Sequence, residues 1–293
     1  MGGSSMTRCS GSSASYCAYP RLNLHGSDAS AQASRLLAMP CPGYALSRGK
    51  PATVVTALKG LRGALREDKD GEGGSSLAEL ESWVSTASTA VPSAKRVCEI
   101  GLNRGHSAVT WLCTNPQAEY VGFDLARYNA SLATQQFLQA AFPGRFRLIV
   151  GDTLVTLPKY AHEHGAACDV LSIDGGHDFA IALSDLSYMR LLARSGHTVV
   201  MDDLRCSQWW CRPPTSVWHY YREAGALNER GCVVAGCCSG WCWGQFNLSR
   251  PWADATPACG PESIRDTTNG RKCRIKTKTF ADTWRQGGFP ALA

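Results

Sequence analysis

From residue 95 onward, short runs of strand-forming residues alternate with longer amphipathic stretches. The short runs are rich in Val, Ile, Phe and Cys and predict β-strands at 96–101, 119–124, 145–150, 168–173 and 197–202. The stretches between and after them repeat apolar residues at helical spacing and predict helices at 105–114, 128–141, 153–164, 178–194 and 215–225. Such alternation is typical of an α/β protein with a largely parallel sheet between layers of helices. Two later apolar segments, 232–235 and 241–248, predict an antiparallel hairpin at one sheet edge.

The remainder of the chain divides into three shorter regions. Residues 1–50 are rich in Ser and small residues, which is typical of an organellar transit segment or of a disordered tail. Residues 51–94 predict two N-terminal helices, at 52–66 and 77–89, separated by a charged, Gly-rich loop. We expect the main domain to span 95–249 and a Pro- and Thr-containing extension to span 250–293.

The positive charge is concentrated at the N-terminal end. The net charge is +6, and residues 1–66 carry eight Lys or Arg and only one acid, Asp28. The predicted domain is therefore nearly neutral, which argues against nucleic acid as a partner. No apolar run has the length of roughly 20 residues that a membrane span needs, so we expect no membrane insertion. No secretory signal pattern is found, so we expect an intracellular protein, cytoplasmic or organellar.

The chain contains 14 cysteines. Cys98, Cys113 and Cys168 lie within predicted strands or helices and are interpreted as small buried apolar residues. Six others cluster late in the chain, at positions 206, 211, 232, 237, 238 and 242, without the paired spacing of a zinc site. Free thiols are the default expectation for an intracellular protein, and one or two disulfides across the hairpin are the alternative.

Acidic residues and glycines recur where the first three predicted strands end. The first strand contains Glu99 and runs into Gly101, Asn103, Gly105 and Ser107 before the next helix begins. Glycines at a strand end let a ligand approach the backbone, and a helix start offers unpaired N–H groups. The second strand ends in Asp124, where a carboxylate suits ribose hydroxyls, and the third is followed by Asp152-Thr153, which suits an adenine amino group. The pattern indicates a nucleoside site.

The next two predicted strands also end in acids. Asp174-Gly-Gly-His177 follows one of them, and Asp202-Asp203 follows the other. The carboxyl ends of parallel strands open on one edge of a sheet, so these groups are expected to converge. Three carboxylates beside an imidazole suit a divalent metal ion and a base. The alternatives are that Asp174 caps the following helix and that the acid pair lies on a solvated loop.

The ordered motifs EIGLNRGHSA, VGFD, VGDT, SIDGGHDF and VVMDDL resemble those of the class I S-adenosylmethionine-dependent methyltransferases. The resemblance covers about residues 77–248 and is strongest to the metal-dependent O-methyltransferases, the group of macrolide-sugar and catechol enzymes. It implies a Rossmann-like, seven-stranded sheet whose last two strands come from the hairpin. It also implies S-adenosylmethionine contacts by a set of motif residues: Glu99, Gly101, Asn103, Gly105, Ser107, Asp124, Asp152, Thr153 and Asp174.

The expected reaction is methyl transfer to an oxygen of a small molecule with neighbouring oxygens, such as a sugar, a polyketide or a catechol. The resemblance implies that Asp174, Asp202 and Asp203 hold Mg²⁺ or Mn²⁺ and that His177 is the general base, although His177 as a further ligand is the alternative. Trp209 and Trp210 are candidate walls of the acceptor pocket. A hydroxylase-like relative on the same fold, and an inactive cofactor-binding protein, are the competing hypotheses. The sequence leaves a homo-oligomer open.

Overall fold

The computed structural model describes residues 38–65, 83–85, 93–206, 208–234 and 240–250. Within them a sheet has the strand order β3-β2-β1-β4-β5-β7-β6. Strands β1 to β5 run parallel, whereas β7 is antiparallel to both of its neighbours. The prediction of a Rossmann-like, seven-stranded, mostly parallel sheet with a terminal antiparallel hairpin is confirmed. The strands are β1 Arg96–Ile100, β2 Glu119–Asp124, β3 Phe146–Val150, β4 Cys168–Ile173, β5 Ala193–Met201, β6 Leu227–Val234 and β7 Gly240–Phe246.

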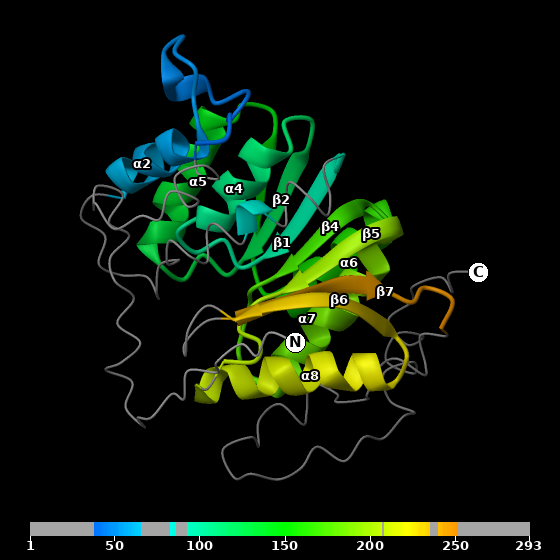
Figure 1. The fold of residues 1–293 in the computed structure, drawn as a ribbon. Coiled ribbons are helices and arrows are strands. Elements are labelled where there is room, and N and C mark those ends of the chain that lie inside the picture. The colour runs from blue at the N-terminus through cyan, green and yellow to red at the C-terminus, as the bar shows by residue number, and fades with distance from the viewer. Residues whose placement is uncertain (1–37, 66–82, 86–92, 207, 235–239, 251–293) are drawn as a thin grey trace, which may run out of the picture.

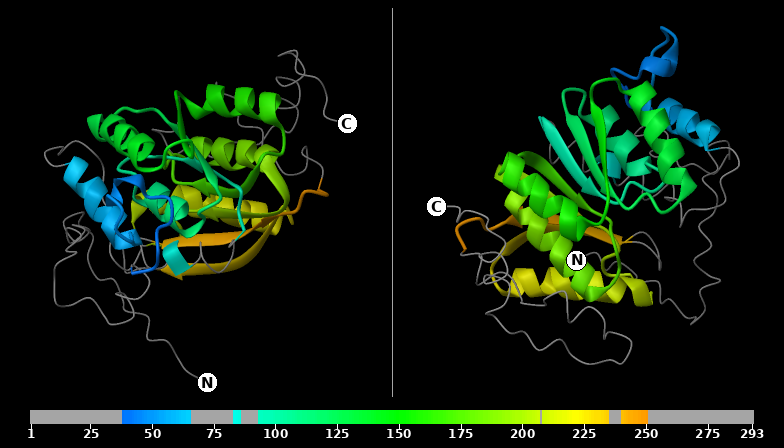
Figure 2. Two further views of the ribbon diagram at one scale, coloured as in Figure 1. Left: turned by 90° about the horizontal axis from the view of Figure 1, so that it is seen from above. Right: turned by 180° about the vertical axis from the view of Figure 1, so that it is seen from behind.

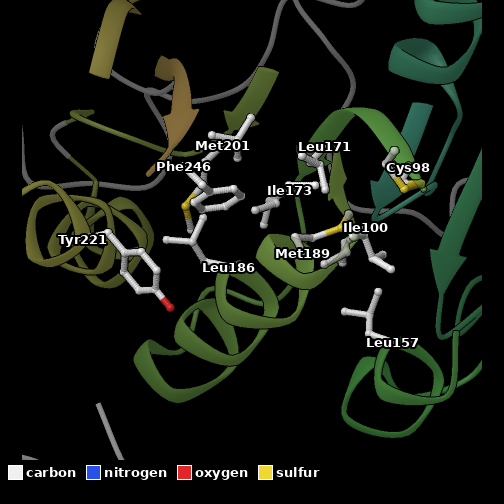
Figure 3. Packing of buried hydrophobic residues seen from close by; sticks show 14 of the residues in the cluster. Cys98, Ile100, Leu157, Leu171, Ile173, Leu186, Met189, Met201, Tyr221 and Phe246 are labelled. Atoms are coloured by element: carbon white, nitrogen blue, oxygen red, sulfur yellow. A yellow bond between two sulfur atoms is a disulfide. The ribbon is translucent and has the colours of Figure 1, made fainter. Parts of the chain in front are cut away.

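Helices cover both faces of the sheet (Figures 1 and 2). They are α2 Val54–Ala64, α4 His106–Thr114, α5 Asn129–Ala141, α6 Thr153–His164, α7 Phe179–Leu192 and α8 Arg212–Glu223, with short 3-10 turns η2 Ala45–Ser47 and η3 Trp209–Cys211. Contacts between neighbouring helices place α2, α4 and α5 on one face, and α6, α7 and α8 on the other. Each face has its own cluster of buried apolar residues. The cluster on the second face joins Leu186 and Met189 of α7 to Ile100, Ile173 and Met201 of the strands (Figure 3).

The central strands are apolar because both of their faces are covered, as is usual in parallel sheets. In β1 every residue from Val97 to Ile100 is buried, and Glu99 is the only acid among them. Helix α8 begins at Arg212, three residues before the predicted start, because Pro213 and Pro214 fall in its first turn, where a missing N–H costs no helical bond. The structure thus keeps the predicted order of elements and shifts a few of their boundaries.

The segment before the domain is packed against it where the structure describes it. Pro40 forms an isolated bridge with Thr53, and Tyr44 packs against Phe137 and Phe142 at the end of α5. Of the predicted helix 77–89, only 83–85 is described; it is helical, and Trp83 stacks on Trp241 at 5.2 Å. Residues 1–37 of the predicted lead and 251–293 of the predicted extension lie outside the described residues.

The expectation of free thiols is wrong for the cysteines that the structure describes. All eight of them are paired, as Cys41–Cys113, Cys98–Cys168, Cys206–Cys211 and Cys232–Cys242. The Cys98–Cys168 bond joins β1 to β4, because parallel neighbours bring cysteines distant in the sequence side by side. Cys232–Cys242 is the bond across the hairpin that the sequence left as an alternative. Glu229 lies beside this pair, but disulfide sulfurs offer no thiolate for zinc.

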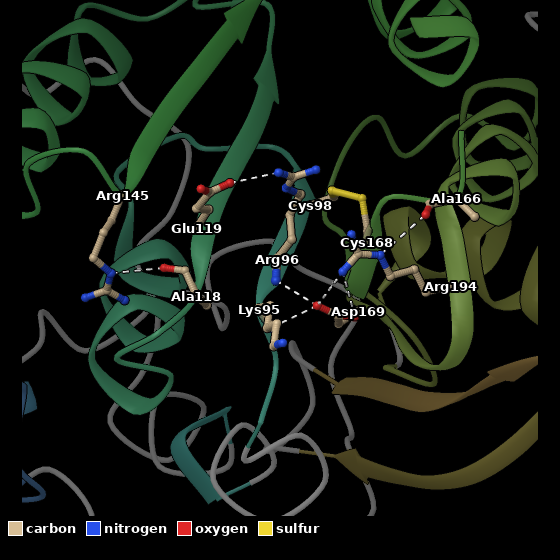
Figure 4. Close-up of polar contacts among 10 residues, drawn as sticks. All are labelled: Lys95, Arg96, Cys98, Ala118, Glu119, Arg145, Ala166, Cys168, Asp169 and Arg194. Atoms are coloured by element: carbon tan, nitrogen blue, oxygen red, sulfur yellow. Dashed lines mark hydrogen bonds and ion pairs between the residues drawn. A yellow bond between two sulfur atoms is a disulfide. The ribbon is translucent and has the colours of Figure 1, made fainter. Parts of the chain in front are cut away.

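The amino-terminal edge of the sheet is closed by charged groups (Figure 4). The Asp169 carboxylate accepts hydrogen bonds of 2.8 Å from the backbone N–H groups of Lys95 and Arg96, and Arg194 lies within 3.4 Å of it. Arg96 pairs with Glu119 at 2.9 Å. Asp169 and Glu119 are thus paired with basic side chains or backbone N–H groups of the same chain. The candidate site is therefore expected at the opposite, carboxyl-terminal ends of the strands. No helix among the described residues is long and apolar enough to cross a membrane.

Candidate active site

The candidate site lies at the carboxyl ends of β1, β4 and β5. The chain order reverses between β1 and β4, since β2 lies on one side of β1 and β4 on the other. Ligands of open α/β sheets bind at such a switch point. Ile100 is in register with Ile173, and Ile173 with Met201. The residues that follow these strands therefore leave the sheet at the same level. The backbone N–H of Asp174 donates to the carbonyl oxygen of Ile100, and that of Asp202 donates to the carbonyl oxygen of Ile173, both at 2.9 Å.

The Asp124 carboxylate holds the turn that follows β1. Its Oδ2 accepts from the backbone N–H groups of Leu102 at 2.7 Å and Asn103 at 3.0 Å, while Oδ1 accepts from Ala126 at 2.6 Å. Asn103 needs this support, because its φ of 42° lies in the left-handed region. The sequence predicts that this acid binds ribose hydroxyls. In the structure its carboxylate fixes the backbone of the turn after β1.

The glycines of the turn are required by close packing of the chain on itself. A Cβ on Gly101 would lie 1.8 Å from the Asp174 carbonyl oxygen, and one on Gly105 would lie 2.4 Å from Thr134 Cγ2. Both residues also have positive φ. The sequence alone explains these glycines by the approach of a ligand. The structure gives a further reason, because a side chain at either position would clash with the chain itself. Gly101 brings the loops after β1 and β4 into contact.

Glu99 lies beneath the turn, with no exposed surface. Its carboxylate accepts hydrogen bonds from Ser107 at 2.8 Å, from Ser172 at 2.7 Å and from the Tyr120 hydroxyl. Burial raises the pKa of Glu99, and the three hydroxyls counteract part of that rise. The predicted cofactor residues Glu99 and Ser107 are therefore bonded to each other. This arrangement fixes the start of α4, where Ser107 lies.

The third strand contributes Asp152 and Thr153, as predicted. Asp152 is the exposed N-cap of α6, and its carboxylate accepts from the backbone N–H of Leu154 at 2.9 Å. The Thr153 hydroxyl donates to Oδ1 of Asp185 at 2.7 Å. Asp185 belongs to α7, and sequence reasoning missed it among the apolar residues of that helix. An acid at a buried position of an amphipathic helix was the signal that marked it.

The part of the site that the sequence predicts to hold a metal ion, here called the metal end, brings together Asp174, His177 and Asp203, whose possible ligand atoms lie within 4.8 Å of one another. His177 Nε2 lies 2.6 Å from Oδ2 of Asp203, and both side chains are partly exposed. Asp202 falls outside this group of three, and its Oδ1 accepts from the backbone N–H of Asp203. The sequence predicted Asp174, Asp202 and Asp203 as ligands with His177 beside them. The geometry brings His177 into the group of three, and Asp202 lies outside it, with its Oδ1 bound to the Asp203 backbone.

The segment after Asp203 turns sharply into η3. Asp203 and Arg205 have φ values of 55° and 59°, and Cys206 is bonded to Cys211. The Cys211 sulfur lies 3.8 Å from Oδ1 of Asp203, so the disulfide closes this segment against the metal end. Of the two tryptophans predicted to wall an acceptor pocket, Trp209 is 70% exposed. Its ring meets that of Trp210 edge to face.

A family model matches the part of the chain that contains the predicted site. Residues 98–204 match a family model described as a methyltransferase domain, Methyltransf_24. This range begins in β1 and ends just after Asp203, so it contains every residue that the sequence predicted to bind the methyl donor or the metal ion. No curated protein matches the chain.

Solved structures of similar fold include the cofactor-bound Rv0187 of MTB, at 20% identity and a TM-score of 0.53, covering 67% of this chain and 90% of that one. The O-methyltransferase TomG of Streptomyces achromogenes, solved with S-adenosylmethionine, has 18% identity and a TM-score of 0.53, with coverages of 65% and 89%. An O-methyltransferase of Bacillus cereus, solved with S-adenosylhomocysteine, has 13% identity and a TM-score of 0.53, with coverages of 65% and 90%.

The described residues have the fold of the Rossmann-like methyltransferases. Residues 98–204 match a methyltransferase domain, and this match together with the fold supports an S-adenosylmethionine-dependent methyltransferase.

Proposed function

We propose that this methyltransferase moves the methyl group of S-adenosylmethionine to a hydroxyl oxygen of a small molecule with neighbouring oxygens, with help from a divalent metal ion. The observation that carries the proposal is the group of Asp174, His177 and Asp203 at the carboxyl ends of β4 and β5. It lies one loop away from the turn after β1, because Gly101 packs directly on the Asp174 backbone. The site proposed for the methyl donor and the site proposed for the acceptor hydroxyl are thus adjacent.

The nucleoside end fits S-adenosylmethionine. Asp124 lies at the end of β2, next to the turn that it fixes, and Asp152 lies exposed at the start of α6. We propose that Asp124 binds the ribose hydroxyls and that Asp152 and Thr153 face the adenine. Glu99, which has no exposed surface, acts through Ser107 by setting the start of α4. TomG and the Bacillus cereus enzyme, with a similar fold, were solved with the methyl donor and its product.

The donor set of the other end fits a divalent cation. Two carboxylates and one imidazole provide oxygen and nitrogen ligands, of which carboxylates suit Mg²⁺ and Mn²⁺. We propose that Asp174 and Asp203 bind the ion, with Asp202 fixing the Asp203 backbone through its hydrogen bond. When bound, the ion makes a coordinated hydroxyl more acidic and fixes its position.

The role proposed for His177 is that of the general base. It takes the proton of the acceptor hydroxyl as that oxygen attacks the methyl carbon in line with the departing sulfur. Asp203, 2.6 Å from Nε2, orients the ring and stabilises the imidazolium that results. After transfer the methyl ether and S-adenosylhomocysteine leave, and the imidazolium returns its proton to water.

The experiment is a transfer assay with methyl-labelled S-adenosylmethionine against panels of sugars, catechols and polyketides, with Mg²⁺, Mn²⁺ or EDTA. We expect label in an alkali-stable ether, loss of transfer in EDTA and recovery on adding the metal. Asp203→Asn is expected to abolish transfer, whereas the matched control Asp178→Asn changes an exposed acid at the cap of α7 and leaves it intact. Full activity in EDTA contradicts the metal role, and label on nitrogen or carbon contradicts O-methylation.

A further inference from the structure

Helix α7 contains a carboxylate at a position where an apolar residue would normally pack. Asp185 is 1% exposed and lies between Leu183 and Leu186, both of which are buried in the core. A carboxyl group buried among apolar side chains destabilises the fold unless it forms hydrogen bonds. The packing of α7 alone therefore does not explain an acid at position 185.

The contacts of Asp185 lead to two different loops of the site. Its Oδ1 accepts from the Thr153 hydroxyl at 2.7 Å, at the first residue of α6. Its Oδ2 lies 2.6 Å from the point where a Cβ on Gly175 would be, so the carboxylate lies against the backbone of the loop after β4. Thr153 comes directly after Asp152, and Gly175 directly after Asp174. One side chain therefore touches the neighbours of both a nucleoside-side acid and a metal-side acid.

The electrostatics agree with a carboxyl group held in place by the hydrogen bond from Thr153. Burial raises the pKa of Asp185 to about 7, with the bond from Thr153 lowering it and the charge of Asp152 adding to the rise. Near neutral pH the Asp185 group thus exists partly as the neutral acid. For that form an asparagine is a close replacement in shape and in its acceptor oxygen.

We propose that Asp185 is a positioning residue that holds the start of α6 and the loop after β4 in a fixed relation, and so sets the affinity for the nucleoside of the methyl donor. The inference rests on the proposed function, because it takes Asp152 and Thr153 to face the adenine. Asp185 itself does not touch the donor. It acts through the Thr153 hydroxyl and through its contact with Gly175.

The test is calorimetric titration of S-adenosylhomocysteine into the full chain and its variants. Asp185→Ala is expected to weaken binding about 10-fold, the equivalent of one lost hydrogen bond that orders the site. Asp185→Asn is expected to bind within about 3-fold of the natural protein, because its amide oxygen accepts the same bond. The matched control is Ser187→Ala on the same helix, whose hydroxyl bonds Leu183 and Tyr221 on the side of α8 and whose loss leaves affinity unchanged.

A second pair of variants covers the case in which Asp185→Ala does not fold. Thr153→Val removes the hydrogen bond from the other side and is expected to weaken binding, whereas Thr153→Ser restores it. Unchanged binding in a folded Thr153→Val, or binding by Thr153→Ser as weak as that by Thr153→Val, overturns the proposal.

The two proposals fail in distinguishable ways. If the natural protein does not bind S-adenosylhomocysteine, the proposed function fails and this inference fails with it. If the natural protein binds while a folded Asp185→Ala binds equally well, only the role of Asp185 is overturned. Equal weakening in Asp185→Asn and Asp185→Ala also overturns it, because charge rather than the hydrogen bond would then matter.

Discussion

The imidazole of His177 and the carboxylate of Asp203 lie 2.6 Å apart, although they follow different strands of the sheet. The pair joins the loop after β4 to the loop after β5. The two roles considered for His177, general base and metal ligand, can be separated by experiment. Loss of a base lowers turnover, whereas loss of a ligand also lowers the affinity for the metal ion.

His177→Ala is expected to lower kcat by about 100- to 10,000-fold, as for the loss of a general base. Affinity for S-adenosylmethionine is expected to stay unchanged, because the nucleoside residues are untouched. The measurements are initial rates and calorimetric titrations of the donor and of Mn²⁺. Mn²⁺ affinity should also persist if His177 is the base. A large loss of Mn²⁺ affinity assigns His177 to the ligand set, and an unchanged rate rejects both roles.

Asp124→Ala is expected to weaken binding of S-adenosylmethionine by more than about 10-fold, since three backbone N–H groups lose their acceptor along with the proposed ribose contact. Thermal unfolding should also occur at a lower temperature. The control is Asp169→Ala, which removes an acid that likewise accepts from two backbone N–H groups, but at the opposite edge of the sheet (Figure 4). Asp169→Ala should lose stability and keep donor affinity. Equal donor affinity in the two variants would remove Asp124 from the nucleoside site.

Asp185 is expected to make stability fall as the pH rises. Its pKa is raised from 3.8 to about 7 by burial, so between these values the folded chain keeps a proton that the unfolded chain has released. The contribution is complete below pH 3.8, and the free energy of unfolding declines by about 1.4 kcal/mol per pH unit up to about pH 7. Asp185→Asn has no such proton, so it should gain stability relative to the natural protein over this window.

Urea unfolding of both proteins at pH 5, 6 and 7 measures the difference. All other titrating groups, including Glu99, are the same in both proteins and cancel in the comparison. The informative quantity is therefore how the difference in the free energy of unfolding changes with pH. A difference that does not change between pH 5 and 7 would show that the carboxyl group of Asp185 titrates normally.

Removal of the Cys206–Cys211 bond is expected to impair the metal end more than the fold. The disulfide joins residues only 5 positions apart in the sequence, so Cys206→Ser/Cys211→Ser should cost about 2 kcal/mol of stability. Its sulfur lies 3.8 Å from the Asp203 carboxylate, so Mn²⁺ affinity and kcat should fall as well. Mn²⁺ titration and initial rates check this. The control Cys232→Ser/Cys242→Ser opens the bond across the hairpin, and we expect it to lower stability by about 3 kcal/mol without changing Mn²⁺ affinity.

The element order could be predicted because strand and helix periodicities alternate clearly from residue 95. Boundaries were less predictable where pairing overrides composition. Strand β5 begins at Ala193 rather than at 197, because Ala193 pairs with Cys168 before a register shift. Strand β6 begins at Leu227, ahead of the predicted 232, although polar residues open it; its Glu229 is bound by Arg205 at 2.7 Å.

The site was predictable in its location and less so in its internal contacts. Acids after successive strands place Asp124, Asp174 and Asp203 at one edge by topology alone. Which acid meets His177 depends on backbone conformation, here the positive φ of Asp203, and composition does not encode it. Cysteine pairing was hidden for a similar reason, since the partners of Cys98 and Cys113 are 70 and 72 residues away in the sequence.

The Cys41–Cys113 bond covalently joins the segment before α2 to α4, 72 residues further along the sequence. A protease cut anywhere between these two cysteines would leave both pieces attached. The cleaved protein would run as one band on a non-reducing gel and as two bands after reduction. A shortened chain that begins after residue 41 would leave Cys113 with an unpaired thiol inside the core.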